Sequence, residues 1–327
     1  MTKTLLLLFL TILFFACKPI KPIENIFDFW WNEMNCKYPF FVEKNIDWDS
    51  VYNVYYEQTR NINESDLQIV FQEIFNLLKD GHCWVEAGKN LIYCTLQTDT
   101  IDKFFYYDIT NYTDIQKITY SDDSAYYLVQ LKNKITYINY RSFWGSINID
   151  EFKNIISNFS YSKGIIFDIR QNGGGQSQNI AEWASCFFTG EKTLWSNKHK
   201  IGCGHSDFTD LISQKAAGNG FLENIPLAVL TSGQTYSAAN YFAGVVKYFP
   251  NVVLIGTKTG GGGSWRTVSL LPNGWLFAYP VAKSYDIENN SMESGLEPTI
   301  KISATPEWYA NHYDIVLETA FNYLINK

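Results

Sequence analysis

The sequence predicts an α/β protein in which buried strands alternate with helices. Two segments carry this prediction, each a short apolar run followed by a turn and then by apolar residues at helical spacing. The first run covers residues 164–169 and precedes three glycines and an amphipathic helix. The second covers residues 225–230 and precedes a polar turn and a helix that begins near Ser237. We expect the alternation of strands and helices to extend over a core of residues 135–327.

The first 16 residues are expected to be a lipoprotein signal peptide rather than part of the fold. Lys3 precedes an apolar run over residues 5–15, and Cys17 follows where signal peptidase would leave it N-terminal and lipidated. Phe14 is an unusual residue at the third position before the cysteine, so the lipoprotein signal is imperfect. A transmembrane anchor is the competing interpretation, although the apolar run is short for a membrane span. With residues 17–24 as a tether, we expect a cell-envelope protein, lipid-anchored to a bacterial membrane and facing the periplasm or the surface.

Two smaller units are predicted between the tether and the core. Residues 25–82 form an aromatic-rich helical domain, and residues 83–134 form a small β insert of short strands with polar turns. The best-defined helix begins at a capping-box pattern of Ser65 and Gln68 and stops at Gly81.

Composition argues against several kinds of partner. The content of 46% hydrophobic and 17% aromatic residues is typical of a globular protein with a well-packed core. The net charge of −7 and the lack of basic clusters argue against nucleic acid. The glycine-rich segments lack the lysine of a P-loop, and the cysteines show no zinc-ligand spacing. We therefore expect neither a cofactor nor a metal.

Two features of the glycine-rich segments indicate chemistry. Ser237 lies where a helix N-terminus offers unpaired N–H groups and a partial positive charge, so it is either an N-cap or a nucleophile. The run Gly173–Gly175 lets the backbone approach a ligand closely with its N–H groups inward. The alternative for these glycines is a tight strand-to-helix turn, which needs one glycine rather than three.

In order and spacing these segments resemble the C-terminal processing peptidases, or tail-specific proteases, a family of serine peptidases. The matching segments are an entry strand at 135–143, a DxRxNxGG loop at 168–175, a TxSAAE-like turn at 235–240, a GxxTxGxxS-like loop from 256 and a GxxPD-like segment from 295. The resemblance implies a crotonase-like α/β spiral core and Ser237 as the nucleophile. Typical members carry a PDZ domain before the core. Only about 50 residues separate His82 from Ile135 here, so we expect none.

The chain departs from the best-known branch of this family at the base that activates the serine. That branch uses a lysine in the glycine loop after the nucleophile, and the corresponding residue here is Gly262, while Lys258 lies outside the motif position. The chain is more similar to the branch of tricorn protease and the interphotoreceptor retinoid-binding protein, which takes a histidine from the segment before the core. Asp80-Gly81-His82 carries that signature.

The resemblance to this branch implies His82 as the base. The alternative is a histidine that only complements the dipole of the preceding helix. An imidazole with an ordinary pKa of about 6.5 can accept a seryl proton at neutral pH. We therefore expect activity to decline as the pH falls through roughly 6–7, with a neighbouring carboxylate moving that decline upward.

The remaining site residues also follow from the resemblance. The tricorn-like branch has an acidic residue shortly before the GxxPD motif, and Glu293 is nearest to that pattern, although its spacing is one residue short. We expect it to orient His82, with a solvated loop glutamate as the alternative. Backbone N–H groups of Ala238 and of Gly174, or of a neighbouring glycine, are expected to form the oxyanion hole.

The resemblance implies a serine peptidase that hydrolyses peptides or unfolded protein tails. A catalytically silent protein that binds peptides or small ligands on the same scaffold is the alternative. It is motivated by the missing lysine and by Asn240, which replaces the glutamate of the family motif. A crotonase-type acyl-CoA enzyme would share the architecture but would give no role to Ser237 and the distant His82.

Overall fold

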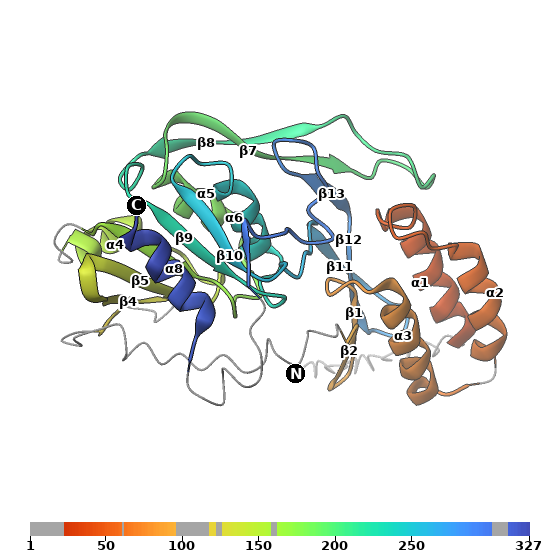
Figure 1. Cartoon of the computed structure of the whole chain (residues 1–327). Helices are drawn as coiled ribbons and strands as arrows, with labels where there is room; N and C mark the ends of the chain where they lie inside the picture. The colour runs from red at the N-terminus through yellow and green to blue at the C-terminus, as the bar shows by residue number, and fades with distance from the viewer. Residues whose placement is uncertain (1–22, 61, 96–117, 122–125, 158–161, 303–312) are drawn as a thin grey trace, which may run out of the picture.

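The computed structural model of the protein describes residues 23–60, 62–95, 118–121, 126–157, 162–302 and 313–327. Figure 1 shows an α/β core at one end, three N-terminal helices at the other and short strands between them. A long hairpin reaches from the core toward the helices. The predicted α/β class is confirmed, and the arrangement agrees with the predicted crotonase-like core.

A seven-stranded sheet forms the centre of the core. Its strand order is β14 (Ile300–Lys301), β10 (Val252–Gly256), β9 (Leu227–Thr231), β6 (Gly164–Asp168), β5 (Ile135–Tyr140), β4 (Tyr126–Gln130) and β3 (Ile118–Tyr120). Pairing is parallel from β5 to β14 and antiparallel among β3, β4 and β5. The central strands are continuous apolar runs because both faces of the sheet are covered.

Helices cover the two faces of this sheet. On one face lie α4 (Ile149–Ser157), α5 (Gln178–Ser185) and α6 (Ala238–Val246), and on the other lies α8 (Ile315–Ile325). Successive residues of a strand face opposite sides, so Phe167 packs with α5 and α6 while Ile166 packs with α8. A short 3₁₀ helix, η3 (Lys132–Lys134), joins β4 to β5.

The N-terminal helices are α1 (Ile23–Lys37), α2 (Trp48–Thr59) and α3 (Glu64–Leu78), and they pack around buried Trp30, Trp48 and Phe71. The ends of α3 differ from the prediction. Its N-cap is Asn63, whose side chain accepts hydrogen bonds from the N–H groups of Ser65 and Asp66. It ends at left-handed Lys79 (φ 48°), and not at Gly81. His82 therefore lies in the loop that follows this helix.

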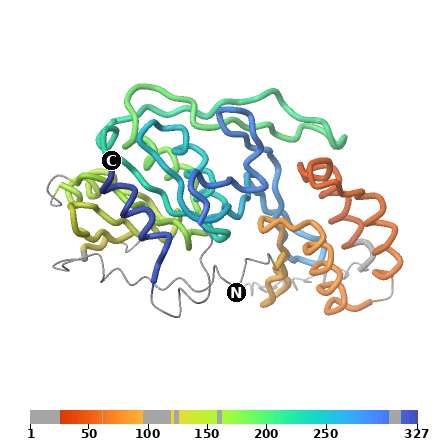
Figure 2. Tube along the Cα trace, in the orientation of Figure 1, coloured from red at the N-terminus to blue at the C-terminus, as the bar shows by residue number. Residues whose placement is uncertain are grey.

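The predicted small β insert at 83–134 is not a separate unit. β1 (Trp84–Ala87) and β2 (Asn90–Tyr93) join a four-stranded antiparallel sheet with β12 (Leu276–Pro280) and β11 (Arg266–Leu270), whereas β3 and β4 belong to the core sheet. The trace in Figure 2 shows late blue segments of the chain returning beside the orange N-terminal strands. An isolated two-stranded hairpin is marginal in water, which explains why β1 and β2 recruit strands from the core.

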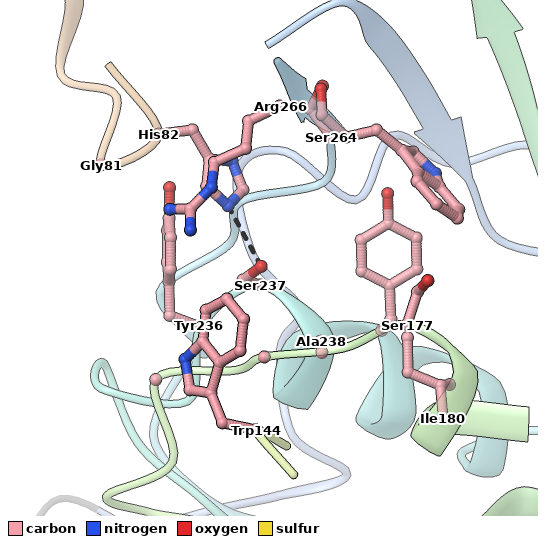
Figure 3. Close-up of a pocket in the computed structure, with 14 residues that line it drawn as sticks. Gly81, His82, Trp144, Ser177, Ile180, Tyr236, Ser237, Ala238, Ser264 and Arg266 are labelled. Carbon is pink, nitrogen blue, oxygen red and sulfur yellow. Dashed lines mark hydrogen bonds between the residues drawn. The ribbon is translucent and has the colours of Figure 1, made fainter. Parts of the chain in front are cut away.

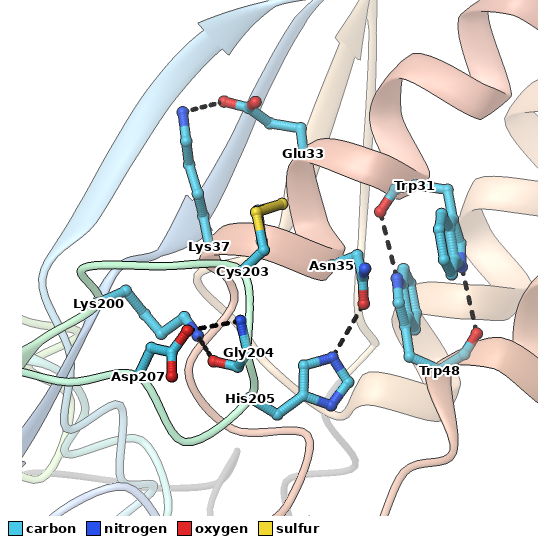
Figure 4. The surroundings of a disulfide bond; sticks show 11 residues. Trp31, Glu33, Asn35, Lys37, Trp48, Lys200, Cys203, Gly204, His205 and Asp207 are labelled. Atoms are coloured by element: carbon cyan, nitrogen blue, oxygen red, sulfur yellow. Dashed lines mark hydrogen bonds and ion pairs between the residues drawn. A yellow bond between two sulfur atoms is a disulfide. The ribbon is translucent and has the colours of Figure 1, made fainter.

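The long hairpin is built from β7 (Thr189–His199) and β8 (Ile212–Asn219), and β13 (Ala282–Tyr285) pairs with β7. A disulfide between Cys36 and Cys203 links α1 to the loop at the hairpin tip (Figure 4). Beside it, His205 Nε2 lies 2.9 Å from Asn35 Oδ1. Sequence reasoning did not predict this disulfide, whose cysteines are 167 residues apart. Within the described ranges, no helix has the length and apolar character needed to cross a membrane.

Candidate active site

A cleft of about 320 Å³ lies where the loop after α3 meets the core (Figure 3). The loop contributes His82, the start of α6 contributes Ser237 and Ala238, and β11 contributes Arg266. Clefts between structural units are common places for ligand sites. Two of the predicted site residues, His82 and Ser237, therefore face the same cleft.

Ser237 has a strained backbone, with φ 53° and ψ −122°. Positive φ is uncommon for a residue other than glycine and is concentrated at functional sites. Its N–H donates to Gly261 O at 2.9 Å, which helps to hold this conformation. Its hydroxyl makes no capping hydrogen bond to α6. The N-cap alternative is therefore wrong for the side chain, which turns toward the cleft.

His82 Nε2 lies 3.1 Å from Ser237 Oγ, although the two residues are 155 positions apart. The backbone N–H of His82 donates a hydrogen bond to Asp80 Oδ1 at 2.9 Å. The imidazole packs against the Tyr236 ring, with the ring centroids 5.0 Å apart. Burial lowers the pKa of His82 to about 4, outweighing the opposing effect of Asp80. The ring is thus neutral at pH 7, and in the tautomer that is protonated on Nδ1 its Nε2 atom can accept a hydrogen bond from Ser237 Oγ. The neighbouring carboxylate does favour the imidazolium, as expected, but desolvation lowers the pKa by more, so the expected net upward shift is wrong.

The space where a lysine base would enter is filled by Tyr236. A Cβ atom at Gly262 would lie 2.5 Å from Cζ of that tyrosine, and Gly262 has φ 78°. No larger residue fits there without displacing the ring on which His82 packs. Lys258 is exposed and does not line the cleft. The role of Tyr236 was not predicted from the sequence. The one available signal is the glycine run 260–263, because consecutive glycines allow a large side chain to pack closely against the backbone.

The glycine loop passes directly beside Ser237. A Cβ atom at Gly174 (φ 98°) would lie 2.7 Å from Ser237 Cβ and 2.8 Å from Ala238 N, so only glycine permits this approach. The N–H of Gly174, however, donates to Asn172 Oδ1 at 2.9 Å. The assignment of that N–H group to the oxyanion hole is therefore wrong. The neighbouring Gly175 lines the cleft together with Ala238.

Residues 134–302, just over half of the chain, match the family model of Peptidase family S41. The chain belongs to this family. It is accordingly a serine-type peptidase, and the predicted resemblance to the C-terminal processing peptidases is confirmed. No curated protein sequence matches the peptidase.

Solved structures share the fold of the peptidase. A candidate peptidase from Parabacteroides merdae ATCC 43184 is 27% identical, with a TM-score of 0.85 over 93% of this chain and 97% of that one. Mature CPAF is 11% identical, with a TM-score of 0.73 over 94% of this chain and 98% of that one. The photosystem II D1 C-terminal processing protease is 14% identical, with a TM-score of 0.53 over 87% and 94%. At these low identities the last two show a common fold alone.

Glu293 lies in a buried charge cluster and makes no hydrogen bond to His82. Its Oε1 pairs with Lys44 Nζ at 2.8 Å, and the same ammonium lies 3.2 Å from Asp80 Oδ2. His82 Nδ1 and Glu293 Oε2 are both buried without a hydrogen-bond partner in the described structure. The prediction that Glu293 orients the imidazole directly is therefore replaced by an indirect link, from Glu293 through Lys44 and Asp80 to the His82 backbone.

Asp80 and Glu293 share the ammonium of Lys44, and their pKa values are shifted in opposite directions. Burial and the Asp80 charge raise the pKa of Glu293 to about 8. Although burial opposes its ionisation, Lys44 holds the pKa of Asp80 below its usual value. Asp80 is thus the ionised carboxylate that contacts His82. No group of side chains in the described ranges could hold a metal ion.

Asn240 has a structural role in the peptidase. Its Nδ2 donates to Met292 O at 2.9 Å, and Thr259 Oγ1 donates to its Oδ1 at 2.6 Å. These bonds connect α6 to the loop that carries Glu293 and to the glycine loop after β10. Asn240 therefore satisfies buried hydrogen-bonding groups, which gives this residue a structural explanation that needs no silent site.

Sequence reasoning also missed the ion pairs that hold the DxRxNxGG loop. Fully buried Arg170 pairs with Asp168 at 2.7 Å and with Asp314 at 2.8 Å. Asp314 also accepts a hydrogen bond from Leu317 N and thereby caps α8. The partner lies 144 residues away, so no local pattern indicates it.

Arg170→Met is expected to destabilise the peptidase by about 3–5 kcal/mol because it leaves two buried carboxylates without their cation. Urea unfolding followed by circular dichroism measures this loss. Arg60→Met is the matched control, since Arg60 is 53% exposed in a surface pair with Glu57 and should change stability by less than about 1 kcal/mol. An Arg170→Met protein as stable as the control would show that these ion pairs do not hold the loop.

Proposed function

We propose that the peptidase uses Ser237 as its nucleophile and His82 as its base, and cuts peptides or unfolded protein tails outside the cytoplasm. The observation that carries the proposal is the 3.1 Å contact between Ser237 Oγ and His82 Nε2. The strained serine backbone and the neutral, buried imidazole support it. A nucleophile within hydrogen-bond reach of a base is the arrangement that covalent catalysis requires.

The contact defines the proton transfers of each turnover. Ser237 Oγ attacks the scissile carbonyl carbon while its proton passes to His82 Nε2. The imidazolium then gives this proton to the leaving amine, and the acyl-enzyme remains. Water attacks the acyl carbon, again losing a proton to Nε2, which returns it to Ser237 Oγ as the acid product leaves. Each residue thus ends the cycle as it began.

The charge that develops on the substrate oxygen lies near the N-terminus of α6. The N–H of Ala238 and the dipole of this helix favour a negative oxygen there. We assign the second donor to Gly175, because the Gly174 N–H is already bonded to Asn172. The negative charge of Asp80 stabilises the imidazolium that forms during the reaction, because it offsets part of the cost of charging a buried ring.

Glu293 enters the proposal as a positioning residue. It contacts Lys44, which contacts Asp80, which in turn holds the backbone of His82. Because Glu293 belongs to the core and the other three belong to the N-terminal part, this chain of contacts fixes the two halves of the site against each other.

The lipid anchor and the envelope location rest on the sequence around Cys17, which lies outside the described residues. The Cys36–Cys203 disulfide supports an extracytoplasmic location, because disulfides persist in oxidising compartments. The net charge of −7 supports peptides rather than nucleic acid as partners.

Cys17→Ser, produced in a Gram-negative host, is expected to move the protein from the membrane fraction to the soluble fraction or to the uncleaved precursor. The reason is that the thioether to the lipid can form only at a cysteine. Fractionation and intact mass measure the shift, and Cys94→Ser is a control that leaves the anchor in place. Wild-type protein that is soluble and carries no acyl chains would refute the anchor.

Proteolysis itself is tested by incubating a denatured proteome with wild-type protein and identifying new chain ends by mass spectrometry. We expect new termini that are absent with Ser237→Ala. A folded wild-type protein that generates none would favour the silent binding protein.

A further inference from the structure

The four-stranded sheet has one face buried and one face toward solvent. Residues paired directly across strands share a face, and this rule defines two rows on the solvent side. One row is Leu270, Leu276, Glu86 and Leu91, and the other is Val268, Ala278, Trp84 and Tyr93. In the second row the small Ala278 is buried and Trp84 is half-buried, so Val268 and Tyr93 are its exposed members. The intervening residues Phe277, Val85 and Ile92 are buried against the N-terminal helices. We call the two rows together the apolar face.

The apolar face is unusual for a surface exposed to water. Leu270 is 58% exposed, Leu91 56%, Val268 51% and Tyr93 50%. The solvent side of an antiparallel sheet normally carries polar residues. Contiguous exposed apolar residues on a soluble domain are typical of an interaction site. Single exposed apolar residues need no such explanation. Here Leu270 and Val268 on β11 lie beside Leu276 on β12, which is 36% exposed, and Leu91 and Tyr93 continue the two rows on β2, at the other edge of the sheet.

The apolar face continues into the catalytic cleft. Arg266, Val268 and Leu270 alternate along β11, so their side chains lie on the same face. Arg266 lines the cleft with His82 and Ser237 (Figure 3). In addition, β11 is an edge strand among the described residues, so its outer side can pair with an extended chain. A polypeptide that leaves the cleft along β11 would meet Val268 and then Leu270.

We propose that the apolar face binds an apolar segment of an unfolded polypeptide whose scissile bond lies in the cleft. This inference rests on the proposed function. Alternate side chains of an extended segment point to one side, which matches the spacing of Val268 and Leu270. Glu86 within the face and the net charge of −7 disfavour an anionic membrane as the occupant.

Binding is measured first in the Ser237→Ala background, where it does not depend on catalysis. The probe is a fluorescent, reduced and carboxymethylated protein, followed by anisotropy. We expect Leu270→Asp to weaken its binding by about tenfold, because a carboxylate replaces an apolar contact. Val54→Asp is the matched control, since Val54 is 57% exposed on α2 and lies outside the apolar face, and it should leave binding unchanged.

In the active enzyme, the readout is the ratio of kcat/KM for this denatured protein to kcat/KM for a tetrapeptide that spans only the cleft. Leu270→Asp should lower the ratio about tenfold, and Val54→Asp should not. Unchanged probe binding in Leu270→Asp and in Leu91→Asp would overturn the inference. So would a wild-type dimer that Leu270→Asp dissociates, or face-dependent binding to phosphatidylcholine vesicles. Probe binding without any hydrolysis by wild type would instead refute the proposed function alone.

Discussion

Ser237→Ala is expected to abolish peptide hydrolysis while leaving the fold intact. Loss of the nucleophile should lower turnover by several orders of magnitude. Because the Ser237 hydroxyl makes no capping bond to α6, its removal should cost less than the roughly 1 kcal/mol of a typical N-cap. Hydrolysis of a denatured protein measures the first effect, and thermal unfolding measures the second.

Ser177→Ala is the matched control for this variant. Ser177 lines the same cleft and makes no capping bond to α5, but no hydrogen bond joins it to His82. Its removal should leave turnover within a fewfold of wild type. A folded Ser237→Ala protein that still cleaves its substrate would remove Ser237 from the mechanism.

His82→Ala is expected to lower kcat by about 10²–10⁴, the usual contribution of a general base. Lys258→Ala is the control, because that lysine is exposed and does not line the cleft, and it should retain activity. Stopped assays with the same substrate compare the two variants. Loss of activity in Lys258→Ala with an active His82→Ala would transfer the role of the base to the lysine.

The same residue fixes the pH dependence of kcat/KM, which reports the free enzyme. A base accepts a proton only in its neutral form, so activity is lost as the pH falls through its pKa. With the pKa of His82 lowered to about 4, activity should persist well below the roughly 6–7 at which an ordinary imidazole loses it. An acid limb that is unchanged in His82→Ala would belong to another group.

The central parts of the site could be predicted because they are local in the sequence. A buried strand, a sharp turn and a helix start place Ser237 at a half-buried bend, and the run of glycines ending at Gly175 permits close approach. His82 was predicted from the resemblance carried by Asp80-Gly81-His82, since its position just after a helix is equally typical of a histidine that only complements the helix dipole. In each case a short stretch of residues predicts the local structure, and the resemblance to the peptidase family supplies the expected catalytic role.

The parts that could not be predicted depend on distant partners. Lys44 meets Glu293, and Arg170 meets Asp314, only because the fold brings segments far apart in sequence together. The side-chain oxygen of Asn172 accepts a hydrogen bond from the Gly174 N–H, and the loop conformation that allows this bond is not defined by the sequence pattern. Burial of the imidazole likewise depends on the whole cleft, so the direction of its pKa shift was predicted with the wrong sign.

Labelling with a fluorophosphonate tests the pairing of Ser237 and His82 most directly, because the probe needs an activated serine but no knowledge of the substrate. Intact mass follows the rate at neutral pH, and peptide mapping locates the adduct. We predict one adduct on Ser237 in wild type, none in Ser237→Ala and labelling at least 100-fold slower in His82→Ala, in line with the contribution of a general base. A folded wild-type protein that is not labelled, or a His82→Ala variant labelled at the wild-type rate, would contradict the account.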